Sequence, residues 1–193
     1  MTEGHFNTKR APVLDNEERL KQLRVDQLLT DIAGIREGMI CVDLGCGTGA
    51  FSFPMVLQVG KEGIVYAVDD SADMLDHLRA KNPPPNLQLV HSDAEQTGLD
   101  SRIADLCLLA FVLHEVKQAD ILVAEAFRLL KPEGKLLIVE WKAELDSPGP
   151  PRKIRLSEEQ VSQFCSQAGF SGFEYIDWAI NNYVAICDKT KPA

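Results

Sequence analysis

One glycine-rich stretch decides the fold of this chain: Val42-Asp43-Leu44-Gly45-Cys46-Gly47-Thr48-Gly49-Ala50. The apolar residues 39–44 predict a buried strand before the glycines, and the apolar residues from Phe51 onward predict a helix after them. Glycine permits a tight turn and lets a ligand approach the main chain closely. The first turn of the helix presents unpaired N–H groups and the positive end of the helix dipole. The stretch therefore predicts a strand–loop–helix unit that holds a nucleotide-like or carboxylate-bearing ligand.

The glycines alone leave the ligand open, because Gly45, Gly47 and Ala50 also fit the dinucleotide-binding fingerprint. Two acidic residues distinguish between the possible ligands. Asp69 ends the next predicted strand, where a carboxylate can accept hydrogen bonds from two ribose hydroxyls. Asp43 lies just before the glycines, where its charge would repel a pyrophosphate and suits a ligand with an ammonium or sulfonium group. The acids therefore favour an aminoacyl nucleoside over a nicotinamide dinucleotide.

Apolar runs alternate with helical patterns on both sides of this unit. The runs at residues 39–44, 64–68, 87–90, 103–110 and 136–139 predict strands, and apolar residues recur at helical spacing between them. The runs are mostly unbroken, which is typical of parallel strands covered on both faces. The pattern predicts an α/β fold, a doubly wound and mostly parallel sheet with helices on both faces.

The last part of the chain has a different pattern. Ser157 and Gln160 have the spacing of a capping box and predict a helix start. Residues 173–180 and 183–187 then predict two strands joined by a tight turn at Asn181-Asn182. We therefore expect the sheet to finish with an antiparallel C-terminal hairpin.

The first part of the chain predicts a loose arm and a helix. Residues 1–16 are expected to form a flexible arm, and residues 17–34 a helix with Asp15 as its N-cap and Glu18 completing a capping box. A length of 193 residues suits one full-sized domain. We therefore expect a single domain over residues 1–193, with its core over 38–188.

Charge and composition disfavour several classes of protein. The chain has 20 Lys and Arg against 29 Asp and Glu, a net charge of -9 that disfavours a nucleic-acid substrate. Apolar runs such as residues 106–113 are far shorter than a membrane span, and residues 1–10 lack the apolar core of a signal peptide. We expect a cytoplasmic protein without a membrane span. The five cysteines have no Cys-x-x-Cys spacing, so no metal site is expected.

A set of motifs carries a resemblance to a known family. They are Asp43 to Gly49 (DLGCGTG), Val65 to Leu75 (VYAVDDSADML), Ser92 to Glu95 (SDAE), Val112 to Val116 (VLHEV) and Leu129 to Gly134 (LLKPEG). In order and spacing they resemble the class I S-adenosylmethionine-dependent methyltransferases, and they are similar to the small-molecule group that includes the quinone-biosynthesis C-methyltransferases. The resemblance implies a Rossmann-like sheet of seven strands, with the last strand inserted antiparallel, and S-adenosylmethionine as cofactor.

The same resemblance implies a role for residues at the strand ends. Asp43 would lie near the methionyl ammonium, and Asp69 would bind the ribose. The other implied cofactor-binding residues are Gly45, Gly47 and Gly49 in the loop, Asp70 and Met74 near the adenosine, Asp93 and Ala94 beside the adenine, and Ala110 and Phe111 on the methionyl side. Met74 alternatively belongs to the core, and Asp93 alternatively caps a helix.

The acceptor side has two candidate catalytic residues, His114 and Glu140, which follow or end predicted strands. Ligands of open α/β sheets bind at the carboxyl ends of the strands, and a general base can assist methyl transfer. The alternatives are a histidine bonded to the backbone at a helix start and a carboxylate with a purely structural role.

The leading hypothesis is methyl transfer from S-adenosylmethionine to a small-molecule acceptor by in-line displacement. A nicotinamide-dependent oxidoreductase and a non-catalytic S-adenosylmethionine-binding protein are the alternatives. The sequence predicts neither the identity of the acceptor nor the oligomeric state.

Overall fold

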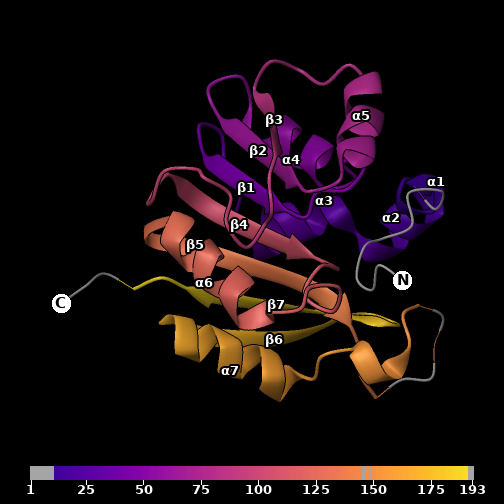
Figure 1. The fold of residues 1–193 in the computed structure, drawn as a ribbon, viewed down its shortest axis with the longest axis vertical. Helices are drawn as coiled ribbons and strands as arrows, with labels where there is room; N and C mark the ends of the chain where they lie inside the picture. The colour runs from indigo at the N-terminus through magenta and orange to yellow at the C-terminus, as the bar shows by residue number, and fades with distance from the viewer. Residues whose placement is uncertain (1–10, 145–146, 148, 191–193) are drawn as a thin grey trace.

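A seven-stranded sheet forms the centre of the molecule (Figure 1). The computed structural model describes residues 11–144, 147 and 149–190. In chain order the strands are β1 (Ile40–Leu44), β2 (Ile64–Asp69), β3 (Leu87–His91), β4 (Ala104–Ala110), β5 (Leu130–Trp141), β6 (Ser171–Ala179) and β7 (Asn182–Asp188). Their order across the sheet is β3-β2-β1-β4-β5-β7-β6. Neighbours from β3 to β5 pair in parallel, whereas β7 runs antiparallel to both β5 and β6. The predicted fold, including the antiparallel C-terminal hairpin, is confirmed.

Helices cover both faces of this sheet, as the unbroken apolar strands predict (Figure 1). On one face lie α4 (Ser52–Val59) and α5 (Ala72–Ala80), together with the N-terminal segments. On the other face lie α6 (Ala119–Leu129) and α7 (Glu158–Ala168), which contact each other. The Ser157–Gln160 capping box forms at the start of α7 as predicted. The sheet therefore separates two apolar cores, and its strands carry buried side chains on both sides.

The N-terminal helix differs from the prediction. Instead of one helix over 17–34, the chain forms α2 (Glu17–Leu23), α3 (Val25–Gln27) and a π-helical turn, η2 (Leu28–Ile32). The break lies at Arg24, which has a left-handed backbone with φ of 49°. Its guanidinium lies 4.0 Å from the centre of the Trp178 ring, and the Trp178 indole donates to the Leu23 carbonyl. Contacts with β6 thus hold the bend, which local helix propensity does not encode.

The N-cap prediction at Asp15 is wrong. Asn16 caps α2, because its side-chain oxygen accepts a hydrogen bond from Arg19 N at 2.9 Å. Asp15 instead bonds to the glycine loop described below. The short helix α1 (Ala11–Leu14) lies within the stretch expected to be a flexible arm, and residues 1–10 of that arm lie outside the described residues.

The hairpin turn lies one residue earlier than predicted. Ile180 and Asn181 form the turn, and Asn182 is the first residue of β7. It pairs with Trp141 of β5 on one side and with Ala179 of β6 on the other. Asn182 is consequently a buried strand residue rather than part of an exposed turn.

Candidate functional site

The glycine loop follows β1 and turns back over the end of β2. The backbone N–H groups of Gly45 and Cys46 both donate to the Val68 carbonyl at 2.9 Å. Gly45 has a φ of 75°, and a Cβ placed on it would lie 2.6 Å from Cγ2 of Val112. A side chain at Gly45 would therefore meet both a strained backbone and the segment after β4. The loop lies at the carboxyl ends of the parallel strands, as predicted, and Val112 packs against its first glycine.

Asp69 ties this loop to the next helix. Its carboxylate accepts from Gly47 N at 2.7 Å and from Ser71 N, at the start of α5, at 3.0 Å. The side chain is buried, and this burial raises the pKa of the carboxyl group, although both hydrogen bonds oppose the shift. Asp69 is thus held in one orientation at the end of β2, with carboxylate lone pairs left for further donors.

Asp43 lies beneath the loop and is fully enclosed by protein. Its Oδ2 accepts from the Ser52 hydroxyl at 2.5 Å, at the first residue of α4. Burial raises the pKa of Asp43 to about 7, opposed by the Ser52 bond and reinforced by the Asp69 charge. Near neutral pH the free protein thus holds a proton on part of its Asp43 side chains. A cation bound nearby would favour the ionised form.

The other predicted cofactor residues differ in their burial and in their hydrogen bonds. Asp70 is exposed, and Met74 is buried on α5 with its backbone N–H capped by Ser71. Asp93 is exposed and accepts from Glu95 N at 2.9 Å, so it closes a turn after β3 rather than capping a helix. Ala94 belongs to the core on the α6 side. The hydrogen bond observed for the Asp93 side chain is local to the turn after β3 and does not involve the glycine loop. Their cofactor roles therefore stay predictions.

An N-terminal strap, residues 11–19, crosses the glycine loop, and sequence reasoning missed it. Asp15 accepts from the Thr48 hydroxyl at 2.7 Å and from Lys81 Nζ at 2.6 Å, while Lys81 also donates to the Thr48 carbonyl at 2.8 Å. Leu14 lies over Gly47, with Cδ1 at 3.2 Å from a Cβ placed there. The Lys81 bond lowers the pKa of Asp15 against the opposing effect of burial. The only signal in the sequence is an acid near a helix start, which is equally typical of a cap.

His114 and Glu140, the two candidate catalytic residues, form a buried pair. His114 Nδ1 lies 2.9 and 3.0 Å from the two oxygens of the Glu140 carboxylate, and Nε2 lies 3.7 Å from a Glu115 oxygen. Glu140 has no exposed surface, and it also accepts from the backbone N–H groups of His114 and Trp141. Burial disfavours the imidazolium, but the Glu140 hydrogen bond and charge outweigh this effect and raise the pKa of His114.

Three aromatic residues, Phe51, Phe111 and Trp141, follow the ends of β1 and β4 and end β5. We call them the aromatic wall. The Phe51 and Phe111 ring centres lie 6.4 Å apart, and those of Phe111 and Trp141 lie 5.5 Å apart. Phe111 has a left-handed backbone with φ of 61°, held by its N–H bond to the Val139 carbonyl at 2.8 Å. The wall connects the glycine loop to the end of β5, beside His114 and Glu140.

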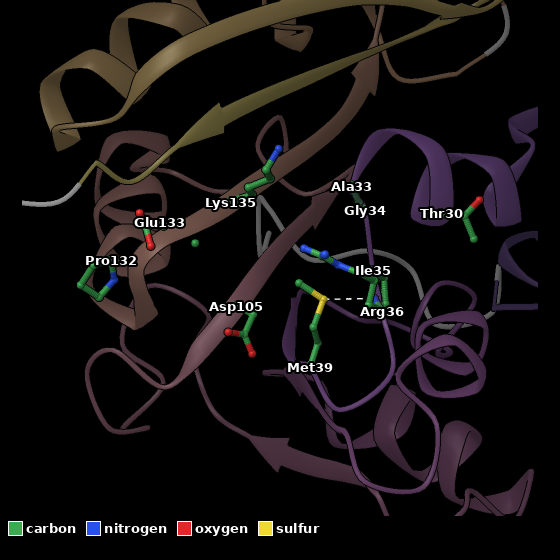
Figure 2. Close-up of a pocket in the computed structure, with 11 residues that line it drawn as sticks. Thr30, Ala33, Gly34, Ile35, Arg36, Met39, Asp105, Pro132, Glu133 and Lys135 are labelled. Carbon is green, nitrogen blue, oxygen red and sulfur yellow. Dashed lines mark hydrogen bonds between the residues drawn. The ribbon is translucent and has the colours of Figure 1, made fainter.

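A pocket of about 450 Å³ lies at the opposite end of the sheet (Figure 2). It is lined by Gly34, Arg36 and Met39 before β1, by Asp105 of β4 and by Lys135 of β5. Open α/β sheets bind their ligands at the carboxyl ends of the strands, so this pocket is separate from the site above.

Within residues 11–144, 147 and 149–190, no group of three or more His, Cys, Asp or Glu side chains is arranged to hold a metal ion. In the same part of the chain, no helix has the length and apolar character needed to cross a membrane.

Comparison with known proteins places this geometry in a family. Residues 42–138, just over half of the chain, match the model of a methyltransferase domain. The ubiquinone/menaquinone biosynthesis C-methyltransferase UbiE of Idiomarina loihiensis is 35% identical over 115 residues, which cover 58% of this chain and 46% of that protein. The demethylmenaquinone methyltransferase of Lactobacillus johnsonii is 34% identical over 110 residues, 55% of this chain and 45% of that protein. The chain thus spans about half the length of these relatives.

The same fold recurs in a solved structure. A SAM dependent methyltransferase from Aquifex aeolicus has a TM-score of 0.89 and 25% sequence identity, over 96% of this chain and 100% of that one. The match with the family model begins inside β1, at the strand that leads into the glycine loop, and ends inside β5. The chain therefore belongs to the methyltransferase domain family, and the predicted resemblance to class I S-adenosylmethionine-dependent methyltransferases is confirmed.

Proposed function

We propose that this chain transfers a methyl group from S-adenosylmethionine to a small-molecule acceptor. The observation that carries the proposal is the Asp69 carboxylate, buried at the end of β2 and held by N–H groups of the glycine loop and of α5. A carboxylate in this position can accept hydrogen bonds from ribose hydroxyls. Family membership and the names of the relatives support the same function.

The residues present fit the cofactor. The glycine loop lies at the carboxyl ends of the parallel strands, where Gly45 adopts a left-handed backbone and packs against Val112. Asp43 and Asp69 supply two buried carboxyl groups, which suit a ligand with a positive ammonium and sulfonium. When bound, the sulfonium supplies an activated methyl group and its own leaving group. The protein then contributes mainly proximity and orientation to an in-line displacement.

We assign the proton-accepting role to His114. Its Nδ1 faces the Glu140 carboxylate, so the neutral imidazole donates through Nδ1 and leaves Nε2 to take a proton from the acceptor. Glu140 acts on the reacting atoms only through its hydrogen bond to His114, which makes it a positioning residue rather than a catalytic one. The remaining predicted residues, Asp70, Met74, Asp93, Ala94, Ala110 and Phe111, are proposed to surround the cofactor as the sequence motifs imply.

A small acceptor suits a chain of this size and charge, and the relatives named as quinone methyltransferases support this class. A cytoplasmic location and the exclusion of nucleic-acid substrates also stay predictions.

Isothermal titration with S-adenosylhomocysteine and with NAD, in parallel, tests the cofactor. We expect heat from S-adenosylhomocysteine alone, and we expect Asp69→Ala to weaken its binding by about 1.5–3 kcal/mol, as for hydrogen bonds to a charged group. Heat from NAD alone would favour the oxidoreductase alternative. Binding of S-adenosylhomocysteine without methyl transfer to any phenol, quinol, thiol or amine would favour a non-catalytic binding protein.

A further inference from the structure

The pocket at the amino ends of the parallel strands has no part in the proposed methyl transfer (Figure 2). Its volume of about 450 Å³ lies in the range of about 300–1,000 Å³ that is typical of small-molecule sites. The residues that line it all belong to the described part of the chain. They come from η2 and the turn that follows it, from β4 and from residues 132–135 of β5. The pocket is therefore a candidate binding site that is separate from the glycine loop.

A tight turn before β1 holds the backbone of Arg36. The Arg36 N–H donates to Sδ of Met39 at 3.1 Å, and the Met39 N–H donates to the Arg36 carbonyl at 3.2 Å. The Gly38 N–H joins the turn to the end of α4, because it donates to the Val59 carbonyl at 2.8 Å. The turn thus fixes the point from which the Arg36 side chain extends into the pocket (Figure 2).

Within the described chain, Arg36 is the charged residue of the pocket that lacks a partner of opposite charge. Neither a hydrogen bond nor an ion pair of its guanidinium is observed with any described residue, and the residue is exposed. Asp105, by contrast, is paired. Lys131 Nζ lies 2.8 Å from both oxygens of Asp105, and the Ile40 N–H donates to Oδ2 at 2.8 Å. The charge of Asp105 is therefore offset by Lys131 and is not paired with Arg36.

The other two charged residues of the pocket, Lys135 and Glu133, have interactions of their own. The Lys135 ammonium lies 3.8 Å from an Asp188 oxygen, although both side chains are about half exposed and such a pair contributes little stability. Glu133 is also engaged in an interaction, and its N–H donates to the Lys189 carbonyl at 2.7 Å. Among the described residues, the lining thus leaves one positive charge, on Arg36, without a partner.

Apolar side chains form another part of the lining. Ile35 is buried beside the pocket, Met39 is partly buried and Pro132 is exposed. Gly34 leaves open space, because a Cβ placed on it would meet no atom within 4 Å. A ligand that matches this pocket therefore combines one negative charge with an apolar body.

We propose that this pocket binds a small organic monocarboxylate, with the carboxylate on the Arg36 guanidinium and the apolar body against Met39 and Pro132. The planar guanidinium donates two parallel hydrogen bonds to a carboxylate, which gives this pair both strength and a fixed geometry. One unpaired cation matches one negative charge, whereas a dianion such as phosphate would keep a second charge without a partner. This site goes beyond the proposed methyl transfer and does not depend on it.

Isothermal titration of the full chain with benzoate, benzamide and inorganic phosphate tests the ligand class. Benzoate and benzamide share the ring and differ in the charge of the head group. We expect benzoate to bind at least about tenfold more tightly than either of the other probes, the effect of hydrogen bonds to a charged group. No heat from benzoate, equal affinity for benzamide, or tighter binding of phosphate would overturn the assignment.

A pair of variants tests the role of Arg36. Arg36→Gln is expected to weaken benzoate binding about ten- to hundredfold. The matched control is Lys61→Gln, which removes an exposed cation from the turn before β2, at the same end of the sheet but outside the pocket. We expect this control to bind benzoate as the wild type does. Equal weakening in both variants would mean that benzoate responds only to the overall charge, and would overturn the site.

Two further measurements separate this pocket from the glycine-loop site and from a structural role. We expect benzoate to bind with the same affinity in the presence and absence of saturating S-adenosylhomocysteine, because the two sites lie at opposite ends of the sheet. Competition between the two ligands would overturn the assignment. Arg36→Gln should keep the wild-type Tm within about 2 °C, since an exposed side chain without a partner contributes little stability, and a large fall in Tm would make Arg36 a structural residue. The comparison of the two variants does not require S-adenosylhomocysteine, so a failure of the proposed function leaves this test intact.

Discussion

Replacing Glu140 by glutamine tests the buried His114–Glu140 pair. The Glu140 carboxylate accepts from His114 Nδ1 at 2.9 Å, from His114 N at 3.3 Å and from Trp141 N at 3.1 Å. A glutamine offers one acceptor oxygen and turns an NH₂ group toward one of these donors. It also removes the charge that stabilises the imidazolium, whose side chain is 5% exposed.

The expected loss of stability depends on pH. Removing one partner of a buried ion pair costs about 3–5 kcal/mol, so we expect Glu140→Gln to lose about 3 kcal/mol near pH 5, where His114 is charged. At alkaline pH above the raised pKa of His114 the imidazole is neutral, and the loss should fall to about 1 kcal/mol, the value of a neutral hydrogen bond. The sign follows from the raised pKa of His114. Stabilisation from the pair is complete below the ordinary histidine pKa of 6.5 and is lost as pH rises through the higher folded value.

Urea unfolding of wild type and variant at both pH values measures this difference. Glu144→Gln is the matched control, because Glu144 is exposed and lies four residues further along the same segment. It should change stability little at either pH. The double variant with His114→Gln should lose less than the sum of the single changes at low pH, since both residues belong to one pair. A loss for Glu140→Gln that is equal at the two pH values would refute the charged pair.

Three further predictions concern the glycine loop and its surroundings. Gly45→Ala should destabilise the protein by about 2–4 kcal/mol in thermal unfolding, through both left-handed backbone strain and overpacking against Val112. The control is Gly98→Ala, because Gly98 has a φ of 72° and open space around it and should lose only the stability that backbone strain costs. Equal losses of stability for the two variants would contradict the steric argument. Burial raises the pKa of Asp43 to about 7, so the free energy of unfolding of the wild type should fall by up to about 4 kcal/mol as pH rises from 4 to 8. Asp43→Asn should flatten this pH dependence in urea unfolding. A variant that keeps the wild-type slope would assign the dependence to another group. Asp15→Asn weakens the hydrogen bonds that hold the strap to the glycine loop. Both the association and the dissociation of S-adenosylhomocysteine should therefore become faster in stopped-flow measurements. Unchanged rates would mean that the strap does not limit access to the cofactor site.

The amino-acid sequence by itself determined the architecture and the position of the glycine loop around which the site is proposed. The glycine loop after an apolar strand, the acids at Asp43 and Asp69, and the alternation of strands and helices are local patterns. Each follows from residue periodicity and backbone preference within a few positions. The antiparallel hairpin followed from these patterns, and the seven-stranded sheet with its last strand inserted antiparallel followed from the resemblance to class I methyltransferases, whereas the order of the strands came from the structure. For the same reason His114 and Glu140 could be selected individually, as polar residues at the ends of apolar strands.

Only the tertiary structure decided which of these groups meet. His114 and Glu140 are 26 positions apart, and their contact depends on the parallel register of β4 and β5. Asp15 bonds to Thr48 instead of capping a helix because the strap folds back across the loop. The hairpin turn differed from prediction by one residue, and in a strand one residue determines which face a side chain occupies. That shift moved Asn182 from a turn to a buried position opposite Trp141. Such contacts join residues distant in the chain, so their physical cause lies in packing and register rather than in local sequence.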